Sequence, residues 1–405
     1  MIDKAFLPDR RGIEIALDQL LAWRERRAAT VAELPGSLPE LGIGEEAAIA
    51  QLAPTVLGYA QRLDARTAFA HMDPPTPWLT WAMTLWNASL NQNLLHPETA
   101  PVARDMEAHV VRWLAPYFGM DGGHMVPGST IGNLTGIWAA REIRGAKVVV
   151  ASDAAHLSVR KAATLLGMQY RAVETDEQGR MNTGTLGDLA QSCLVLTAGT
   201  TSVGAVDPLD ASGAAAWTHV DAAWAGPMRL SHRHADALAG IERADSVSVS
   251  AHKWLFQPKE SALIFFRNTQ LAHSAISFEG AYLAEPNIGL LGSHGATAIP
   301  LLAMLYAWGR TGIAERIERC MEAAASFAAA LRAMPGVDVF DQPTTGVVAW
   351  RSQRTSTESL RERLPAGSTS VTLIHGEKWL RNVAANPNVD PIALAERVKE
   401  MLDQV

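Results

Sequence analysis

The chain has 405 residues, of which 48% are hydrophobic and 19% charged, and its formal net charge at pH 7 is −7. This length and composition predict a globular protein with one large hydrophobic core and a smaller one. The negative net charge leaves no basic surface to neutralise phosphates, so nucleic acid is not an expected partner.

Membrane insertion and disulfide cross-linking are not expected either. Charges interrupt the apolar positions of the first 27 residues, unlike those of a signal peptide, and no later stretch has the roughly 18 uncharged apolar residues of a membrane span. Cys193 and Cys320 are far apart in apolar surroundings, which argues against a disulfide framework and a cysteine-rich zinc site. We therefore expect a cytoplasmic protein without a bound metal.

The first 75 residues predict a helical N-terminal arm. Apolar residues recur with helical spacing over residues 12–28 and 46–63, and the Pro/Gly-rich stretch ELPGSLPELGIG separates the two segments. Amphipathic helices of this kind need a partner surface for their apolar faces.

Residues 76–290 alternate between helical and extended patterns, which predicts a large α/β domain. Helices are expected over residues 104–119, 131–145 and 156–167, and strands over 147–152, 169–173, 193–197, 217–223, 246–251 and 262–266. Short apolar strands between helices are typical of a mainly parallel sheet that is covered on both faces. Ligands of such sheets bind beyond the carboxyl ends of the strands.

Residues 291–405 predict a second, smaller α/β domain. It begins with apolar helical patterns, and it continues with short strands and a closing helix. The helical patterns cover residues 298–310 and 313–334, the strands 346–350 and 371–375, and the last helix 390–402.

Two motifs of the large domain favour a bound anion and a buried acid. In PGSTIGN, residues 127–133, a helix begins where backbone N–H groups and the hydroxyls of Ser129 and Thr130 suit an anion, although ordinary helix capping has the same pattern. Asp221 ends the strand in HVDAAWAG. A carboxylate there is costly unless it faces a cation or several donors, and a lone aspartate is usually a cap.

Two further motifs place His156 and Lys253 at strand ends. In SDAAHLSVRKA, a lone histidine between strand and helix is more often a cap or a core residue than a catalyst. In SVSVSAHKW, the lysine follows an alternating strand, where a solvated charge is the usual interpretation. We expect Trp254 and Leu255 to anchor the turn that holds this lysine.

Together, the four motifs predict a site for pyridoxal 5'-phosphate. The helix start suits its phosphate, and Asp221 suits a protonated pyridine nitrogen. Lys253 offers an amine for a Schiff base with the cofactor aldehyde. Burial and neighbouring cations are expected to lower the pKa of that amine, which makes it a better nucleophile.

The run HVDAAWAG followed by SVSVSAHKW resembles the fold type I, pyridoxal-phosphate-dependent group II amino-acid decarboxylases, the family of the aromatic amino acid, histidine and glutamate decarboxylases. The resemblance covers most of the chain, including PPTPWLTWAMTLWNASLNQN, ETAPVARDMEAHVVRWL, PGSTIGNLTGIWAAR, LTAGTTSVGAVDPL and LRNVAANPNVD. It implies an aspartate-aminotransferase-like large domain with a mainly parallel seven-stranded sheet. It also implies decarboxylation of an L-amino acid to the corresponding amine and carbon dioxide.

The resemblance assigns a role to each motif residue. Lys253 looks like the Schiff-base lysine and Asp221 like the partner of the pyridine nitrogen. Ala223 would pack on one face of the cofactor ring, and His156 would stack on the other as a catalytic residue. Further cofactor contacts are implied for Ser129, Thr130, Ser250 and His252 at the phosphate, and for Thr200 near the cofactor oxygen.

The resemblance also implies an obligate homodimer with active sites at the interface, and it assigns a catalytic tyrosine. Tyr282 resembles the tyrosine of the family's mobile loop, which is associated with protonating the carbon after carbon dioxide leaves; a packing aromatic is the alternative. The segment after it is short, and His294 stands where relatives usually have an arginine. His294 and Arg381 are candidates for holding the substrate carboxylate, although Arg381 also suits a structural ion pair.

The short segment after Tyr282 and the histidine in place of an arginine differ from the family pattern, and they leave two other functions open. The first is a lyase on the same scaffold that cleaves carbon–carbon or carbon–sulfur bonds. The second is a non-catalytic protein that retains the fold, which the complete set of Lys253, Asp221 and His156 disfavours.

Overall fold

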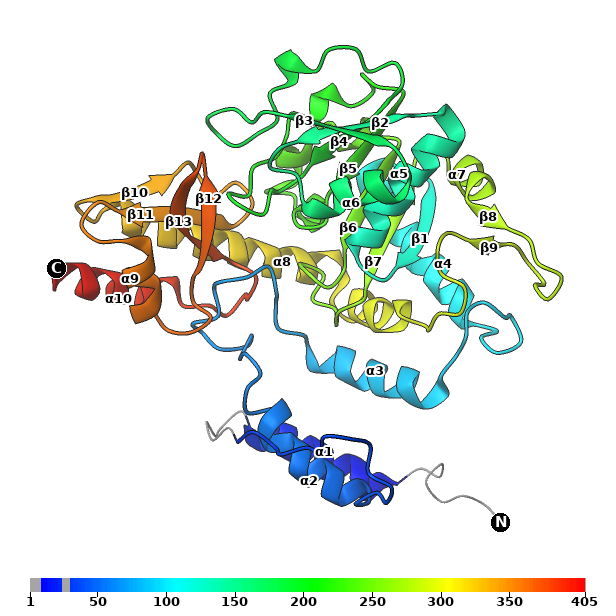
Figure 1. Cartoon of the computed structure of the whole chain (residues 1–405), viewed down its shortest axis with the longest axis horizontal. Coiled ribbons are helices and arrows are strands. Elements are labelled where there is room, and N and C mark those ends of the chain that lie inside the picture. Colours follow the sequence, from blue (N-terminus) through cyan, green and yellow to red (C-terminus); the bar gives the residue numbers. More distant parts are fainter. Residues whose placement is uncertain (1–8, 24–29, 405) are drawn as a thin grey trace. The chain divides into compact units, whose positions relative to one another are not determined.

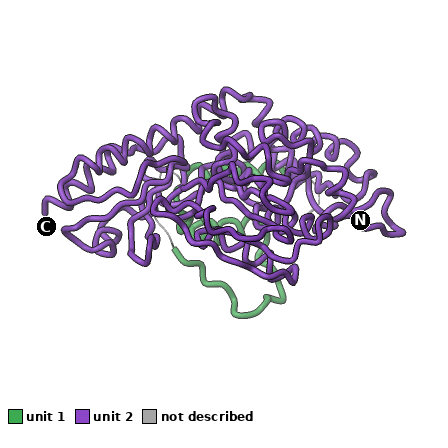
Figure 2. Tube along the Cα trace, turned by 90° about the horizontal axis from the view of Figure 1, so that it is seen from above, with its two compact units in different colours: residues 1–62 green, residues 63–405 purple. Residues whose placement is uncertain are grey.

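The computed structural model describes residues 9–23 and 30–404. The chain divides into two compact units, Met1–Arg62 and Leu63–Val405, which Figure 2 shows in different colours. This division falls after Arg62, whereas the predicted domain boundaries after residues 75 and 290 stay predictions. The last part of the first predicted helix, residues 24–28, lies outside the described residues.

The first unit is a pair of helices, α1 (Arg10–Trp23) and α2 (Glu45–Val56). The two helices pack against each other, and the guanidinium of Arg62 lies 5.3 Å from the ring centroid of Trp23. Neither helix contains a buried residue. The apolar side chains of Ile13 and Leu17 are each about half exposed, so the predicted amphipathic helices are present with their apolar positions accessible.

The second unit contains a seven-stranded sheet in the order β1-β7-β6-β5-β4-β2-β3 (Figure 1). Its strands are β1 (Gly122–Val126), β2 (Val148–Ser152), β3 (Gln169–Val173), β4 (Ser192–Thr197), β5 (Trp217–Asp221), β6 (Ser246–Ser250) and β7 (Ala262–Phe266). Strands β2 to β6 pair in parallel, and β7 runs antiparallel to both of its neighbours. The sheet is therefore mainly parallel, as predicted.

Helices cover both faces of this sheet. One face carries α5 (Ser129–Arg144) and α6 (Leu157–Leu165), which pack on each other and on the strands, and α7 (Thr269–Ala275) packs beside α5. Successive residues of a strand enter different cores, because side chains alternate across a sheet. On β2, for example, Val149 belongs to the core under α5 and α6, whereas Val150 belongs to the core on the opposite face.

The opposite face is covered by α4 (Ala103–Leu114) and by the long helix α8 (Ala298–Arg332), against which α3 (Trp78–Leu90) also packs. The two predicted helical segments form this one element, and Gly309 kinks it with φ 61° and ψ −177°. A positive φ strains any residue with a Cβ, so glycine is suited to the kink. The predicted break near residue 310 is thus explained by the non-helical backbone of Gly309.

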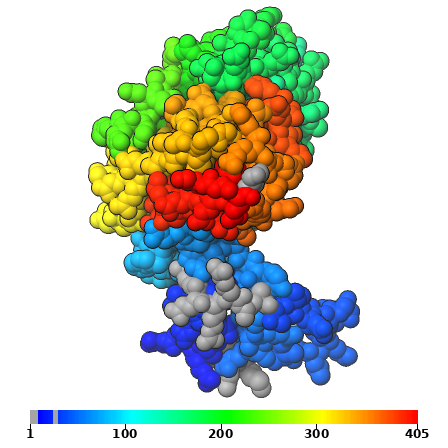
Figure 3. Space-filling view, turned by 90° about the vertical axis from the view of Figure 1, so that its left-hand side faces the viewer, coloured from blue at the N-terminus to red at the C-terminus, as the bar shows by residue number. Residues whose placement is uncertain are grey.

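Helix α8 continues to a four-stranded antiparallel sheet with the order β10-β11-β13-β12 (Figure 1). Its strands are β10 (Val337–Phe340), β11 (Val347–Ser352), β12 (Ser370–Ile374) and β13 (Glu377–Val383). The C-terminal helix α10 (Pro391–Asp403), red in Figure 3, packs on α8. The short elements are α9 (Thr357–Arg363) and the hairpin of β8 (Ser277–Phe278) with β9 (Asn287–Ile288).

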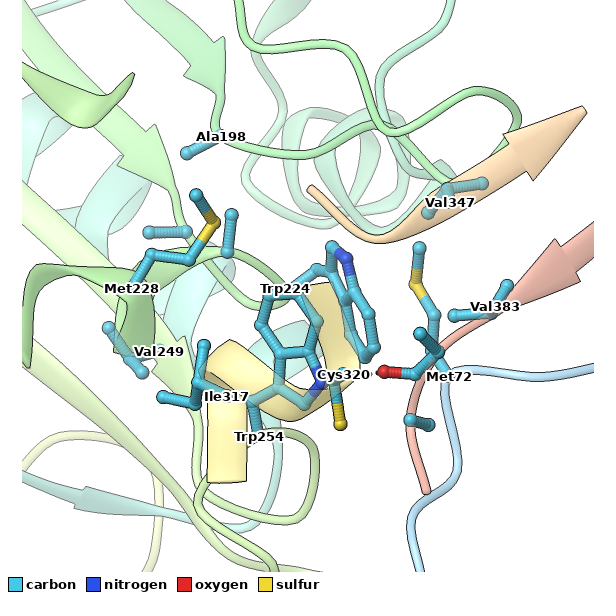
Figure 4. Close-up of a cluster of buried hydrophobic side chains, with 14 of the residues drawn as sticks. Met72, Ala198, Trp224, Met228, Val249, Trp254, Ile317, Cys320, Val347 and Val383 are labelled. Carbon is cyan, nitrogen blue, oxygen red and sulfur yellow. Dashed lines mark hydrogen bonds between the residues drawn. The ribbon is translucent and has the colours of Figure 1, made fainter. Parts of the chain in front are cut away.

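One buried cluster connects the two sheets. Figure 4 shows Trp224 and Trp254 from the large sheet's loops beside Ile317 and Cys320 of α8 and Val347 of β11. The two indole rings lie 4.2 Å apart between centroids. Among the described residues, no helix combines the length and the apolar character that crossing a bilayer requires.

Candidate active site

A cavity of about 300 Å³ lies at the carboxyl ends of the central strands. Its lining comes from five separate connections of the large sheet. The lining residues are Pro127, Gly128, Ser129, Thr130, Asn133, His156, Thr197, Gly199, Thr201, Asp221, Ala223, Trp224, Ser250, His252 and Lys253. The structure therefore brings together eight of the residues predicted to bind the cofactor: Lys253, Asp221, Ala223, His156, Ser129, Thr130, Ser250 and His252.

Lys253 follows β6 in a tight connection to the antiparallel strand β7. The backbone N–H of Phe256 donates to the carbonyl of Lys253 at 2.8 Å, and that of His252 donates to Ser261 at 3.0 Å. Trp254 and Leu255 are fully buried, and the indole N–H of Trp254 donates to the carbonyl of Ala384 at 3.0 Å. These contacts confirm that Trp254 and Leu255 anchor the turn.

The electrostatic surroundings of Lys253 favour a reactive amine. Burial lowers the pKa of this lysine, while the charge of Asp221 partly offsets the effect. A larger fraction of the amine is therefore neutral at a given pH than for an exposed lysine. A neutral amine is the form that attacks an aldehyde.

Asp221 ends β5 and is only 4% exposed. Its Oδ1 accepts the backbone N–H of Ala223 at 3.1 Å, and its Oδ2 accepts Nδ2 of Asn133 at 2.8 Å. Among the ion pairs of the described residues, none involves Asp221. A buried carboxylate without a cation is stabilised by a ligand that carries one, such as a protonated ring nitrogen.

The start of α5 suits a phosphate. Gly128 precedes the helix with φ 102°, and no side chain caps the helix. Gly128, Ser129 and Thr130 line the cavity at this helix start, where the positive end of the helix dipole lies. The hydroxyls of Ser129 and Ser250 lie 2.7 Å apart, so both reach the same point. Burial lowers the pKa of His252 to about 4, with Lys259 and Lys253 adding to the effect.

His156 caps α6, and its Nδ1 accepts the backbone N–H of Ser158 at 3.3 Å. Burial lowers the pKa of this imidazole, so the ring is neutral at pH 7. Thr200 does not line the cavity: its Oγ1 accepts the backbone N–H of Ala205 at 3.0 Å. The neighbouring Thr201 lines the cavity instead.

Besides Thr200, three more predicted residues lie outside the lining of this cavity. Tyr282 is 75% exposed in the turn that follows β8. His294 lines a second cavity of about 360 Å³, together with Glu107 and His124. Arg381 lies on β13 and donates to the carbonyl of Thr201 at 2.6 Å, so it contacts a residue that lines the Lys253 cavity.

Sequence reasoning missed Asn133, Thr197, Thr201 and Trp224 as lining residues. Asn133 lies inside the quoted motif PGSTIGN, and Trp224 lies inside HVDAAWAG. Thr197 and Thr201 lie inside the quoted motif LTAGTTSVGAVDPL, so position in a motif was the available signal for all four. Nothing in a single sequence shows which residues of a loop face a cavity.

Comparisons with known proteins agree with this chemistry. The family model described as "Pyridoxal-dependent decarboxylase conserved domain" matches residues 45–353. The chain belongs to this family. Pyridoxal 5'-phosphate is accordingly its cofactor, and the predicted decarboxylation of an amino acid is confirmed at the level of the family.

Relatives with assigned names are similar over much of the chain. It is 30% identical to L-2,4-diaminobutyrate decarboxylase of Rhizobium meliloti over 349 residues, 78% of this chain and 70% of that protein. It is 32% identical to a probable L-aspartate decarboxylase of Halobacterium salinarum over 303 residues, 68% of this chain and 84% of that protein.

A solved structure supports the fold. Oryza sativa TDC, solved with PLP and tryptamine, superposes with a TM-score of 0.85 at 20% identity, covering 99% of this chain and 96% of that one. The predicted fold type I architecture is therefore confirmed.

Proposed function

We propose that the cavity around Lys253 holds pyridoxal 5'-phosphate and decarboxylates an L-amino acid to the corresponding amine. One observation carries this assignment. Asp221, a buried carboxylate without an ion-pair partner among the described residues, shares a small cavity with a lysine of lowered pKa. Asp221 matches the protonated pyridine nitrogen of the cofactor, and Lys253 matches its aldehyde.

Each residue then has a separate task. Asp221 would hold a proton on the ring nitrogen, Lys253 would anchor the cofactor covalently, and His156 and Ala223 would contact its ring. Ser129, Thr130, Ser250 and the start of α5 bind the phosphate. When bound, the cofactor supplies a conjugated electron sink for the bond that breaks. The protein decides which bond that is, through the orientation of the substrate.

We also propose that Arg381 binds the substrate carboxylate. Its guanidinium donates to the carbonyl of Thr201, to the carbonyl of Ala70 at 3.4 Å, and to the hydroxyl of Ser370 at 3.1 Å. These partners are neutral, and in the described part of the chain Arg381 forms no ion pair. A half-buried arginine with neutral partners is better stabilised by an added carboxylate than one that is already paired. His294 in this role, and Tyr282 as proton donor, stay predictions.

A homodimer with active sites at the interface and a cytoplasmic location belong to the same proposal. Exposed aromatic side chains on two contacting helices support the dimer: Trp78 on α3 is 72% exposed and Tyr306 on α8 is 84% exposed. Sedimentation equilibrium tests the dimer, and a monomer at micromolar concentration contradicts it. The two free cysteines are buried, which is compatible with a reducing compartment.

The cofactor assignment is tested on the purified protein. Borohydride reduction followed by peptide mass spectrometry should place a pyridoxyl group on Lys253, and Lys253→Ala should abolish both the label and turnover. Lys259→Ala is the matched control, because Lys259 is an exposed lysine paired with Asp73. A label on another residue, or normal activity of Lys253→Ala, contradicts the assignment.

The reaction is tested with a panel of L-amino acids that includes 2,4-diaminobutyrate and aspartate. Equal amounts of carbon dioxide and amine support decarboxylation. An aldehyde or a sulfur product without carbon dioxide identifies a lyase of another type. Covalent cofactor binding without turnover of any substrate identifies a non-catalytic protein.

A further inference from the structure

A network of buried polar side chains surrounds Asn133 of α5, which also lines the Lys253 cavity. The Nδ2 atom of Asn133 lies 2.8 Å from Oδ2 of Asp221 and 2.9 Å from Oγ of Ser158. Its Oδ1 atom lies 2.6 Å from Oγ of Ser248 and 3.0 Å from Nε2 of His219. An asparagine amide has two N–H donors and two acceptor sites, so Asn133 uses its full hydrogen-bonding capacity.

The carboxylate of Asp221 decides the orientation of this amide. A carboxylate oxygen only accepts hydrogen bonds, so the amide nitrogen of Asn133 must face Asp221. The amide oxygen then faces His219, which must donate from Nε2. The other ring nitrogen of His219 accepts from Oγ of Ser246 at 2.8 Å, and that oxygen accepts the indole N–H of Trp217 at 3.0 Å. From Trp217 through Ser246, His219 and Asn133 to Asp221, each group therefore donates a hydrogen bond to the next.

A second branch of the network leads to His156. Because Oγ of Ser158 accepts from Asn133, its own proton is free to point at Nδ1 of His156, which lies 2.7 Å away. The backbone N–H of Ser158 points at the same nitrogen. Nδ1 of His156 is therefore an acceptor, and the proton of the neutral ring lies on Nε2.

Two glycines let α5 come close enough to the sheet for these bonds. A β-carbon on Gly132 would lie 2.9 Å from Cβ of Ser248, and one on Gly136 would lie 2.7 Å from Cε1 of His219. Both distances are shorter than a van der Waals contact, so the close approach depends on glycine. Asn133 is 1% exposed at this contact.

We propose that Asn133 is a positioning residue for the cofactor site: its amide orients the carboxylate of Asp221, and its bond to Ser158 directs the hydroxyl of that serine at Nδ1 of His156. The proposal rests on the roles assigned to Asp221 and His156 in the proposed function. Asn133 touches neither the substrate nor the reacting atoms in this role. It acts by holding the two side chains that do contact the cofactor.

The test compares three variants by cofactor affinity and by the tautomer of His156. Apo-protein is titrated with pyridoxal 5'-phosphate, and ¹⁵N NMR of histidine-labelled protein reports the tautomer, with His156→Gln used to assign the signal. Asn133→Ala should raise the Kd of the cofactor about ten- to hundredfold, because a hydrogen bond to a charged group is lost. The proton of His156 should stay on Nε2, because the backbone N–H of Ser158 still points at Nδ1.

Two variants separate the branches. Ser158→Ala should keep the cofactor Kd within about threefold of wild type, because the bond between Asn133 and Asp221 remains. The backbone N–H at position 158 should keep Nδ1 of His156 an acceptor. Thr135→Val is the matched control: Thr135 is buried on the same helix, and its hydroxyl bonds only to the carbonyl of Ile131. Neither measurement should change in that variant.

A folded Asn133→Ala protein with wild-type cofactor affinity overturns the proposal. If Asn133→Ala does not fold by circular dichroism, Asn133→Ser is measured in its place, and wild-type cofactor affinity of that folded variant overturns the proposal. Failure of the proposed function has a different signature, because wild-type protein then carries no pyridoxyl group on Lys253, or Asp221→Ala binds the cofactor as well as wild type.

Discussion

Gly136 of α5 faces the imidazole of His219 on β5, and a β-carbon added to this glycine would lie 2.7 Å from Cε1 of the ring and 3.0 Å from Oγ of Ser246. Gly136→Ala should therefore destabilise the protein by about 1–3 kcal/mol through overpacking. An alanine within a helix is otherwise favoured over glycine by about 1 kcal/mol. A loss of stability in Gly136→Ala would therefore identify the steric clash with His219 and Ser246.

Urea unfolding measures this effect, and Gly12→Ala is the matched control. Gly12 lies in α1, where an added β-carbon meets only the flexible side chain of Asp9. The control is expected to be neutral or slightly stabilising. A Gly136→Ala protein as stable as wild type would show that α5 moves away from β5 at little cost.

Protein stability should fall in acid partly because His219 is buried as a neutral ring. Burial lowers its pKa to about 4, against 6.5 for the unperturbed group. The unfolded chain therefore binds more protons than the folded chain between these values, and the stability from His219 is lost as the pH falls from about 6.5 to about 4. The loss amounts to about 3 kcal/mol.

A comparison of wild type with His219→Gln isolates this contribution. Other buried histidines, such as His124 with a pKa of about 3, titrate in both proteins and cancel. The difference in unfolding free energy between the two proteins should shrink by about 3 kcal/mol from pH 6.5 to pH 4. Parallel pH curves would mean that His219 does not titrate on unfolding.

Trp254→Ala should cost about 3–5 kcal/mol, because it opens a cavity in the cluster of Figure 4 and removes the bond to Ala384. Trp254→Phe keeps most of the apolar volume but leaves the carbonyl of Ala384 without this donor, which costs about 1–3 kcal/mol. Denaturant midpoints measure both. We also expect weaker pyridoxyl labelling of Lys253 in the alanine variant, since the turn loses its anchor.

Arg381→Lys should raise the KM for the substrate roughly tenfold or more, because an ammonium cannot replace the planar, bidentate guanidinium. Steady-state kinetics measures the change, and unchanged cofactor absorbance shows that the cofactor site is intact. Arg66→Lys is the control, since Arg66 pairs with Asp390 at the surface. An equal KM in Arg381→Lys and wild type would leave Arg381 with a structural role only.

Cys193 and Cys320 should not react with a thiol reagent in the native protein. Both side chains are fully buried, and burial raises the pKa of each thiol, so little thiolate is available for reaction. Both should react after unfolding in guanidinium. Rapid labelling of the native protein would indicate local opening around α8 or β4.

The sequence was informative where a strand has a strong pattern of its own. The apolar runs of β4 and β7 and the alternating run of β6 predict these strands within one residue of the observed bounds. Strand β1 was missed, because Gly122 and Gly123 have low strand propensity and are ordered by pairing with Phe266 and Phe265 of β7. Such long-range pairing leaves no local signal.

The residues of the candidate site show the same contrast between those that the sequence predicts and those that it does not. Asp221 and Lys253 were predictable, because strand ends of a parallel sheet share one edge, whereas Ser250 was implied by the family resemblance alone. Asn133 was not predictable, since its role depends on how closely α5 approaches β6. Tyr282 and His294 depend on the conformation of residues 279–297, for which the sequence carries no periodic pattern.

Strand β1 lies at the edge of the sheet and pairs only with β7. About 140 residues separate the two strands along the chain. At roughly 5–20 residues per second, a ribosome needs on the order of 7–30 s to add them. During that interval β1 has no neighbouring strand, and α5, which packs on both β6 and β7, has no complete surface to dock on. The cavity around Lys253 therefore forms only after β7 has been synthesised, when β1 and β7 can pair.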